Sequence, residues 1–124
     1  MTCADSSSFI AFIKGDPGPD VLMVAQALAS SQLVLAPVSL FELLSDPGLT
    51  PSLEKLVIGI PRLDISLGYW ERAGRLRALL MKHKYRPKIA DTLIAQSCLD
   101  HDVPLITRDQ DFKPFQKLAG LRLL

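Results

Sequence analysis

The sequence predicts an α/β fold in which a central, mainly parallel sheet is flanked by helices. Short apolar runs of strand length alternate with longer segments whose apolar residues recur at helical spacing. This alternation is typical of parallel sheets, because each crossover between parallel strands needs a helix. The 124 residues, of which 48% are hydrophobic and 22% charged, suffice for one well-filled core. We therefore expect a single domain over residues 1–124.

Gly, Pro, Ser and Asp separate the expected elements of the first half. We predict a weak strand over residues 1–4 and a helix from about Ser7, whose hydroxyl can cap it. Residues 15–19 end that helix, and Asp20 is the expected cap of a second helix. The elements that follow are a strand over 33–36, a helix carrying Glu42, a turn over 45–48, and a helix from Thr50-Pro51 to Gly59.

The second half continues the alternation. We predict a strand over residues 60–63 and a long helix from Ser66 to about His83, which residues 85–87 break. The remaining elements are a helix over 88–99, a buried strand over 103–107, a loop or short helix, and a last strand over 121–124.

Several classes of protein are excluded by composition. The uncharged stretch over residues 21–41 is interrupted by Gln26 and Pro37 into pieces too short to cross a membrane. The first residues lack the basic start and apolar core of a secretory signal. Cys3 and Cys98 stand far apart, so we expect no Cys-based zinc site and no disulfide framework. Reduced thiols and a cytoplasmic location follow as expectations.

Acidic residues come directly after two of the predicted strands. Asp5 follows the first strand and Asp109 follows the strand over 103–107. The carboxyl ends of parallel strands meet at one edge of a sheet, where ligands bind. Glu42 and Asp91 lie near the starts of their helices, so they are expected to face the same edge. Carboxylates this close repel one another, and Mg²⁺ or Mn²⁺ would relieve the repulsion. Such an ion could activate a water for attack on a phosphodiester.

Each acid also has a simpler explanation. Asp5 could be a helix-entry residue, Asp91 a first-turn acid favoured by the helix dipole, and Asp109 an ordinary turn residue. Glu42 is harder to explain as surface, because its immediate neighbours on both sides are apolar. No phosphate-binding glycine pattern and no Ser-His-Asp arrangement competes with a metal site.

Four segments together are similar to one known family: Asp5-Ser6-Ser7, Phe41-Glu42-Leu43, Ala90-Asp91-Thr92-Leu93-Ile94-Ala95, and residues 105–112 (LITRDQDF). They resemble PIN-domain proteins, and within these the VapC ribonuclease toxins of bacterial and archaeal toxin–antitoxin pairs. Two departures are Ser6 in place of the usual Thr and a less aliphatic first strand, Thr2-Cys3-Ala4.

The resemblance implies a PIN-like three-layer α/β/α fold and an endoribonuclease that depends on Mg²⁺ or Mn²⁺. It also implies inhibition by a small cognate VapB-like antitoxin, and homodimerisation. By position, Asp5, Glu42, Asp91 and Asp109 match the family's acidic metal-binding quartet, Asp111 matches an auxiliary acid, and Ser7 and Thr107 match the hydroxyl residues that orient the acids.

A basic segment precedes Asp91. It holds half of the fourteen basic residues: Arg72, Arg75, Arg77, Lys82, Lys84, Arg86 and Lys88. We interpret it as a track for the RNA backbone; the alternative is a solvated helix face. The net charge of +1 hides this polarity, because residues 1–64 contain three basic and seven acidic residues whereas residues 65–90 contain seven and one.

Two other functions stay open. A PIN-fold protein could act as a non-catalytic interaction module, which would bind no metal at the quartet. A receiver-type phosphoacceptor domain also has this size and binds Mg²⁺ through Asp. It needs adjacent acids after the first strand and a late Lys, whereas Asp5 stands alone and Thr107-Arg108-Asp109 contains no Lys.

Overall fold

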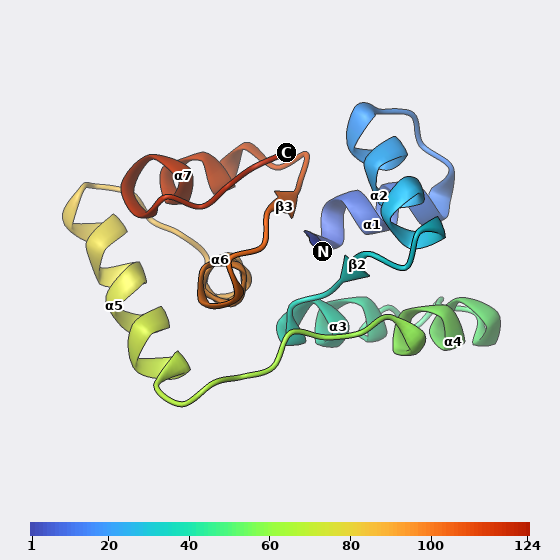
Figure 1. Ribbon diagram of the computed structural model, residues 1–124, viewed down its shortest axis with the longest axis horizontal. Helices are drawn as coiled ribbons and strands as arrows, with labels where there is room; N and C mark the ends of the chain where they lie inside the picture. The colour runs from blue at the N-terminus through green and yellow to red at the C-terminus, as the bar shows by residue number, and fades with distance from the viewer.

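Three short parallel strands form the centre of the computed structural model, which describes residues 1–124 (Figure 1). They are β1 (Thr2–Ala4), β2 (Leu33–Val34) and β3 (Leu105–Ile106), in the spatial order β2-β1-β3. Cys3 lies opposite Val34 on one side and Leu105 on the other, so β1 is the central strand. The helical elements are α1 (Ser6–Lys14), α2 (Pro19–Ala29), α3 (Pro37–Leu44), α4 (Pro51–Gly59), α5 (Tyr69–Lys82), α6 (Ile89–His101), the 3₁₀ turn η1 (Gln110–Phe112) and α7 (Lys113–Ala119).

The sheet separates two hydrophobic cores. Successive residues of a strand point to opposite faces. Cys3 and Leu105 therefore pack with residues of α5, α6 and α7, whereas Ala4 and Ile106 pack with residues of α1, α2, α3 and α4. Figure 1 shows α5, α6 and α7 on one side of the strands and α1, α2 and α4 on the other. The predicted α/β architecture, a parallel sheet between layers of helices, is confirmed. No helix combines the length and apolar character needed to cross a membrane.

Helix boundaries were predicted correctly where the signal is local. The Thr50 hydroxyl accepts a hydrogen bond from the Leu53 N–H at 3.3 Å, with Pro51 in the first helical position. Helix α4 ends at Gly59, as predicted. A proline in the first turn loses no helical hydrogen bond, because the first N–H groups have no partner within the helix.

Two predicted caps in the N-terminal part were wrong. Ser7 lies inside α1, and its hydroxyl donates to Oδ2 of Asp5 at 2.7 Å. Asp20 lies in the first turn of α2, after the N-cap residue Gly18, and its carboxylate accepts from Ser8 at 2.8 Å. In both cases the side chain is hydrogen-bonded to another side chain and is not the N-cap that accepts from a helix N–H.

The predicted cap of the long helix was also wrong. Helix α5 begins at Tyr69, and Gly68 takes the N-cap position with a φ of 83°, in the left-handed region that glycine tolerates. Ser66 instead donates to Asp100 of α6 at 3.3 Å.

Two predicted strands are single bridges. Leu35 pairs with Arg62, and Leu105 pairs with Leu123, without extending to neighbouring residues. Pro61 has no N–H to continue the first pairing. Strands β2 and β3 are likewise shorter than the predicted ranges 33–36 and 103–107.

Candidate metal centre

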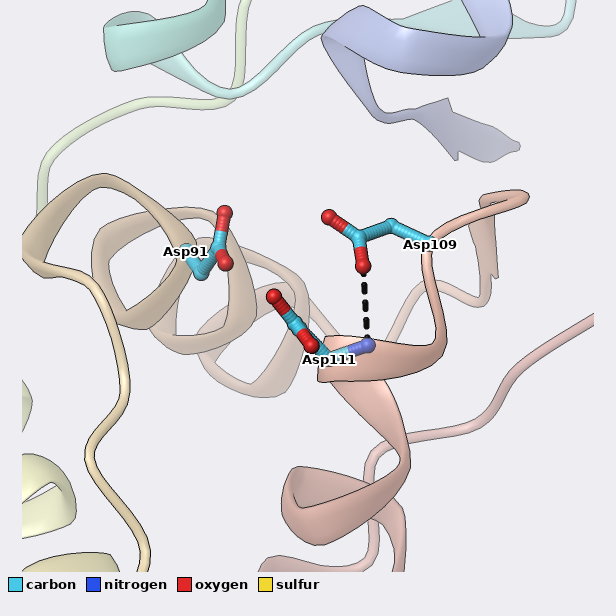
Figure 2. Close-up of side chains that lie close together, drawn as sticks. All are labelled: Asp91, Asp109 and Asp111. Atoms are coloured by element: carbon cyan, nitrogen blue, oxygen red, sulfur yellow. Dashed lines mark hydrogen bonds between the residues drawn. The ribbon is translucent and has the colours of Figure 1, made fainter.

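Three acidic side chains converge beyond the carboxyl end of β3. Asp91 comes from the first turn of α6, Asp109 from the loop after β3, and Asp111 from η1. One carboxylate oxygen from each lies within 4.8 Å of the others. Figure 2 shows the three carboxylates facing a common space. A divalent cation can be held between oxygens at this separation, and carboxylates are the donors that Mg²⁺ and Mn²⁺ prefer.

Hydrogen bonds fix the loop that carries two of these acids. The Asp109 carboxylate accepts from the Asp111 N–H at 2.9 Å, the contact drawn as a dashed line in Figure 2. The Thr107 hydroxyl accepts from the Asp109 N–H at 3.0 Å and donates to Asp5 at 3.0 Å. Thr107 therefore links the end of β3 to the end of β1.

Asp5 is a buried carboxylate beside this group. It is only 5% exposed, and its Oδ2 accepts from both Ser7 and Thr107. Burial raises its pKa, the two hydroxyl donors oppose that change, and the charge of Asp109 adds to it. Ser7 and Thr107, the hydroxyl residues expected to orient the acids, thus both contact Asp5. Its carboxylate is held in one orientation while still repelled by Asp109.

Asp91 experiences the strongest perturbation in the site. Its pKa is raised to about 6, first by desolvation and next by repulsion from Asp5 and Asp109, while the charge of Lys88 lowers it. Asp5 therefore belongs to the same electrostatic cluster as the three acids, although it lies outside the closest grouping. The cost of this arrangement would be removed by a bound cation, so the donor set fits the divalent metal.

Glu42 lies on the exposed surface of α3 and is not part of the closest acidic grouping. Its Oε1 accepts from the Ser6 hydroxyl at 2.9 Å, which places it next to the residue that follows Asp5. Ser6 had been noted only as a departure from the usual Thr. The sequence analysis did not anticipate the contact between Ser6 and Glu42. The only local indication was that Ser6 places a hydroxyl directly after Asp5.

The basic segment is divided by its contacts. Arg72 forms a bidentate ion pair with Asp100, at 2.7 and 2.9 Å, and Arg77 donates to the carbonyl of Pro87 at 3.1 Å. The remaining five basic side chains are exposed and have no hydrogen-bond or ion-pair partner: Arg75, Lys82, Lys84, Arg86 and Lys88.

Arg108 is a second residue that sequence reasoning missed. It stands between Thr107 and Asp109, and its guanidinium pairs with Asp20 of α2 at 2.8 and 3.1 Å. The same guanidinium donates to the carbonyl of Pro17 at 3.2 Å. These contacts anchor the loop after β3 to the start of α2. The partners are 88 and 91 positions away, and nothing local in the sequence announces them.

A parallel three-layer α/β protein with an acidic centre at the carboxyl ends of its strands is the class that fold and site define. The PIN domain family matches residues 2–118, and the chain belongs to that family. No curated protein sequence matches it.

Solved structures share the fold at low sequence identity. "Structure of FitAB bound to IR36 DNA fragment" is 17% identical with a TM-score of 0.75, covering 100% of this chain and 94% of that chain. "Crystal Structure of FitAcB from Neisseria gonorrhoeae" is 16% identical with a TM-score of 0.71, covering 100% of this chain and 96% of the other. At this identity the similarity establishes the fold alone.

Proposed function

We propose that this PIN-domain protein is a metal-dependent endoribonuclease that hydrolyses RNA phosphodiester bonds with Mg²⁺ or Mn²⁺. The observation that carries the proposal is the convergence of Asp91, Asp109 and Asp111 within 4.8 Å, beside the buried Asp5. Acids are kept together against their repulsion where a cation offsets it. PIN domains are generally nucleases, which agrees with this chemistry.

Asp91, Asp109 and Asp111 would hold the cation. Asp5 lies nearby at the start of α1, and Glu42 of α3 contacts Ser6 next to it. A divalent cation bound there supplies a water of lowered pKa and neutralises charge developing on the phosphodiester. The protein's own contribution is to hold the ligands still. Ser7 and Thr107 fix Asp5, and the Asp111 N–H fixes Asp109.

RNA as the substrate is supported by the exposed basic residues beside the acids. Lys88 is the N-cap residue of α6, three positions before Asp91. Arg75, Lys82, Lys84 and Arg86 precede it on α5 and in the following loop. Lys and Arg side chains along this path would offset the charge of the RNA phosphates and direct the RNA backbone toward the acids. Arg72 is engaged by Asp100, so we leave it out of the binding track.

The test is incubation of the purified protein, free of any partner, with total RNA and Mg²⁺, followed by mapping of the cut ends. Asp91→Asn should abolish cleavage, and so should chelation of the metal. Asp64→Asn is the matched control, because Asp64 is exposed and its carboxylate has no partner. Wild-type cutting by Asp91→Asn would refute the proposal. Absence of metal binding in a titration would favour the non-catalytic interaction module instead.

We further propose that the protein is the toxin of a type II toxin–antitoxin pair, inhibited by a VapB-like antitoxin. The resemblance to VapC toxins supports this, together with an apolar cavity of about 330 Å³ between α1 and the α3–α4 region. Its lining includes the apolar Ile10, Ile13, Leu43 and Leu53 and the charged Lys14, Glu42 and Asp46. An antitoxin segment seated there would lie beside Glu42. Coexpression of the antitoxin should block RNA cleavage, and Ile10→Asp should restore it.

A homodimer is proposed on the exposed apolar side chains near the start of α5. Leu67, Trp70 and Ile89 are largely exposed, and Trp70 and Ile89 line one shallow cavity. Apolar groups gathered on a surface are typical of protein contacts. Light scattering should give a dimer for the wild type and a monomer for Trp70→Lys.

We also propose a cytoplasmic location, in keeping with the free thiols of Cys3 and Cys98.

A further inference from the structure

A cavity of about 340 Å³ adjoins the acidic centre, between the loop that connects α5 to α6 and the segment from η1 to α7. Asp111 belongs both to its lining and to the acidic group, so the cavity lies next to the candidate metal site. Figure 1 shows the α5–α6 connection passing beside α7. Nothing in the metal chemistry requires this space, and its lining differs in character from the acidic centre.

The lining combines charge, an amide and rigid apolar walls. Arg86 and Lys88 supply two positive charges against the one negative charge of Asp111, and Gln110 supplies an amide that can both donate and accept. Tyr85 is partly buried against the core and provides an aromatic wall. Charged and amide side chains thus make up half of the lining, and Leu80, Tyr85, Pro87 and Pro114 supply the apolar surface. An anionic group joined to a flat, hydrogen-bonding ring matches it best.

The loop that carries these residues is held at both ends. The Arg77 guanidinium donates to the carbonyl of Pro87 at 3.1 Å. The Lys88 carbonyl accepts from the Thr92 hydroxyl at 2.9 Å and from the Thr92 N–H at 3.0 Å. At its start, the Tyr85 N–H donates to the carbonyl of Leu80 at 3.1 Å. The cavity is therefore formed before any ligand arrives, which lowers the entropy cost of binding.

We infer that this cavity binds one nucleotide of a single-stranded RNA, next to the phosphodiester that is cut. Arg86 and Lys88 hold the phosphate, the base lies against Tyr85, and the Gln110 amide contacts the edge of the base. Single-stranded RNA is read in this manner because its unstacked bases can enter pockets and stack on aromatic side chains. The position of the cut relative to this nucleotide rests on the proposed ribonuclease function, whereas nucleotide binding by the cavity does not.

The first test measures binding without cleavage. The wild-type protein, in the presence of a chelator, is titrated calorimetrically with each of the four nucleoside 5′-monophosphates, and with ribose 5-phosphate and inorganic phosphate. At least one nucleotide should bind about tenfold tighter than ribose 5-phosphate, because a hydrogen-bonded, stacked base adds to the phosphate contact. Equal affinities for nucleotides, ribose 5-phosphate and phosphate would overturn the inference, because the cavity would then hold only an anion.

Variants separate the contacts. Gln110→Ala should remove the preference among bases while leaving the affinity for ribose 5-phosphate unchanged. Arg86→Ala combined with Lys88→Ala should weaken all ligands by at least about tenfold, as expected on loss of charged hydrogen bonds. Lys55→Ala, on α4 beyond the other face of the sheet, is the matched control and should bind as the wild type does. Unchanged base preference in Gln110→Ala would contradict the assignment.

The second test reads the cut sites. Across a random-sequence RNA, Gln110→Ala should lose base preference at one position adjacent to the cut and keep the other preferences. Unaltered preferences would overturn the inference while leaving the ribonuclease intact. Nucleotide binding by a protein that cuts no RNA would instead refute the proposed function and leave the cavity as a nucleotide site.

Discussion

Asp91 carries the largest electrostatic cost among the candidate ligands. Its pKa is raised to about 6 by desolvation first and by the charges of Asp5 and Asp109 next. A carboxyl whose pKa is higher in the folded than in the unfolded chain stabilises the fold at low pH, where it is protonated in both states. That contribution is lost as the pH rises through about 6. At neutral pH the metal-free protein therefore bears unrelieved repulsion.

Asp91→Asn should consequently stabilise the metal-free protein at neutral pH. We expect a gain of about 1 kcal/mol in the free energy of unfolding, after allowance for the partial solvent exposure of the side chain. Chemical denaturation with a chelator present measures it. The gain should vanish below pH 4, where Asp91 is protonated, and Asp64→Asn should show none. A variant less stable than the wild type at neutral pH would contradict the repulsion.

Ser39 presents a different cost, a buried hydroxyl without a partner. Its Oγ has no hydrogen bond, although the residue is 0% exposed on α3. We expect Ser39→Ala to stabilise the protein by about 1 kcal/mol, because an unpaired buried polar group loses its hydration without compensation. Ser8→Ala is the matched comparison: Ser8 is equally buried, but its hydroxyl donates to Asp20. Its removal should destabilise by a similar amount, and equal effects of the two variants in denaturation would refute the explanation.

Side-chain partners are where the sequence is least informative. Asp20 precedes an apolar helical segment and satisfies the local criteria for a cap, yet its carboxylate pairs with Arg108, 88 positions away. Ser66 similarly contacts Asp100, 34 positions away. A local hydrogen bond to backbone competes with any charged or hydroxyl partner that the fold brings near. Only the folded chain decides that competition.

At the scale of elements, Arg108 connects the start of α2 to the loop that carries Asp109 and Asp111. We expect Arg108→Ala to weaken Mg²⁺ or Mn²⁺ binding about fivefold while the fold persists, because the loop loses its anchor and its acids become less well oriented. Calorimetric titration of the metal measures this affinity.

The double-variant cycle separates anchoring from a general effect of charge. Removing Arg108 also removes a positive charge near the acids, which alone would strengthen cation binding. Asp20→Asn should therefore lower the metal affinity as Arg108→Ala does, and the double variant should bind the metal about as well as either single variant. Metal affinity that is unchanged or higher in Arg108→Ala would show that the pair has no part in positioning the site.

Elements were predictable to the extent that their ends are encoded locally. Thr50-Pro51 gave the correct start of α4, since cap and proline act within one turn. Residues 60–63 and 121–124 have the apolar composition of strands but pair at only one position each. Strand length depends on how far a neighbour runs alongside, which is a property of the assembled sheet.

At the scale of the whole molecule, the parallel sheet explains why distant acids could be anticipated as a group. Asp5 and Asp109 follow the adjacent strands β1 and β3, and parallel strands end at the same edge. Helix α6 brings Asp91 to that edge. The structure brings Asp111 into the closest group and leaves Glu42 outside it. The resemblance had implied that Glu42 belongs to the metal-binding quartet and that Asp111 is an auxiliary acid. The direction in which η1 turns after Asp109 could not be derived from spacing.

The position of the candidate ligands at this edge of the sheet predicts how metal binding changes the stability of the whole fold. The candidate ligands Asp91, Asp109 and Asp111 come from α6, the loop after β3 and η1, which only the fold brings together, so a cation that binds them stabilises only the folded state. At a free metal concentration about one hundred times the dissociation constant, the gain in unfolding free energy should be about 2.7 kcal/mol. For a protein of this size, that corresponds to a rise of about 10 °C in melting temperature. Thermal unfolding with Mg²⁺ or Mn²⁺, compared with the same protein in the presence of a chelator, measures this rise.

Asp109→Asn keeps an acceptor for the Asp111 N–H but removes a charged ligand. Its melting temperature should therefore rise far less on addition of metal than that of the wild type or of Asp64→Asn. Equal rises in all three proteins would place the cation elsewhere on the molecule.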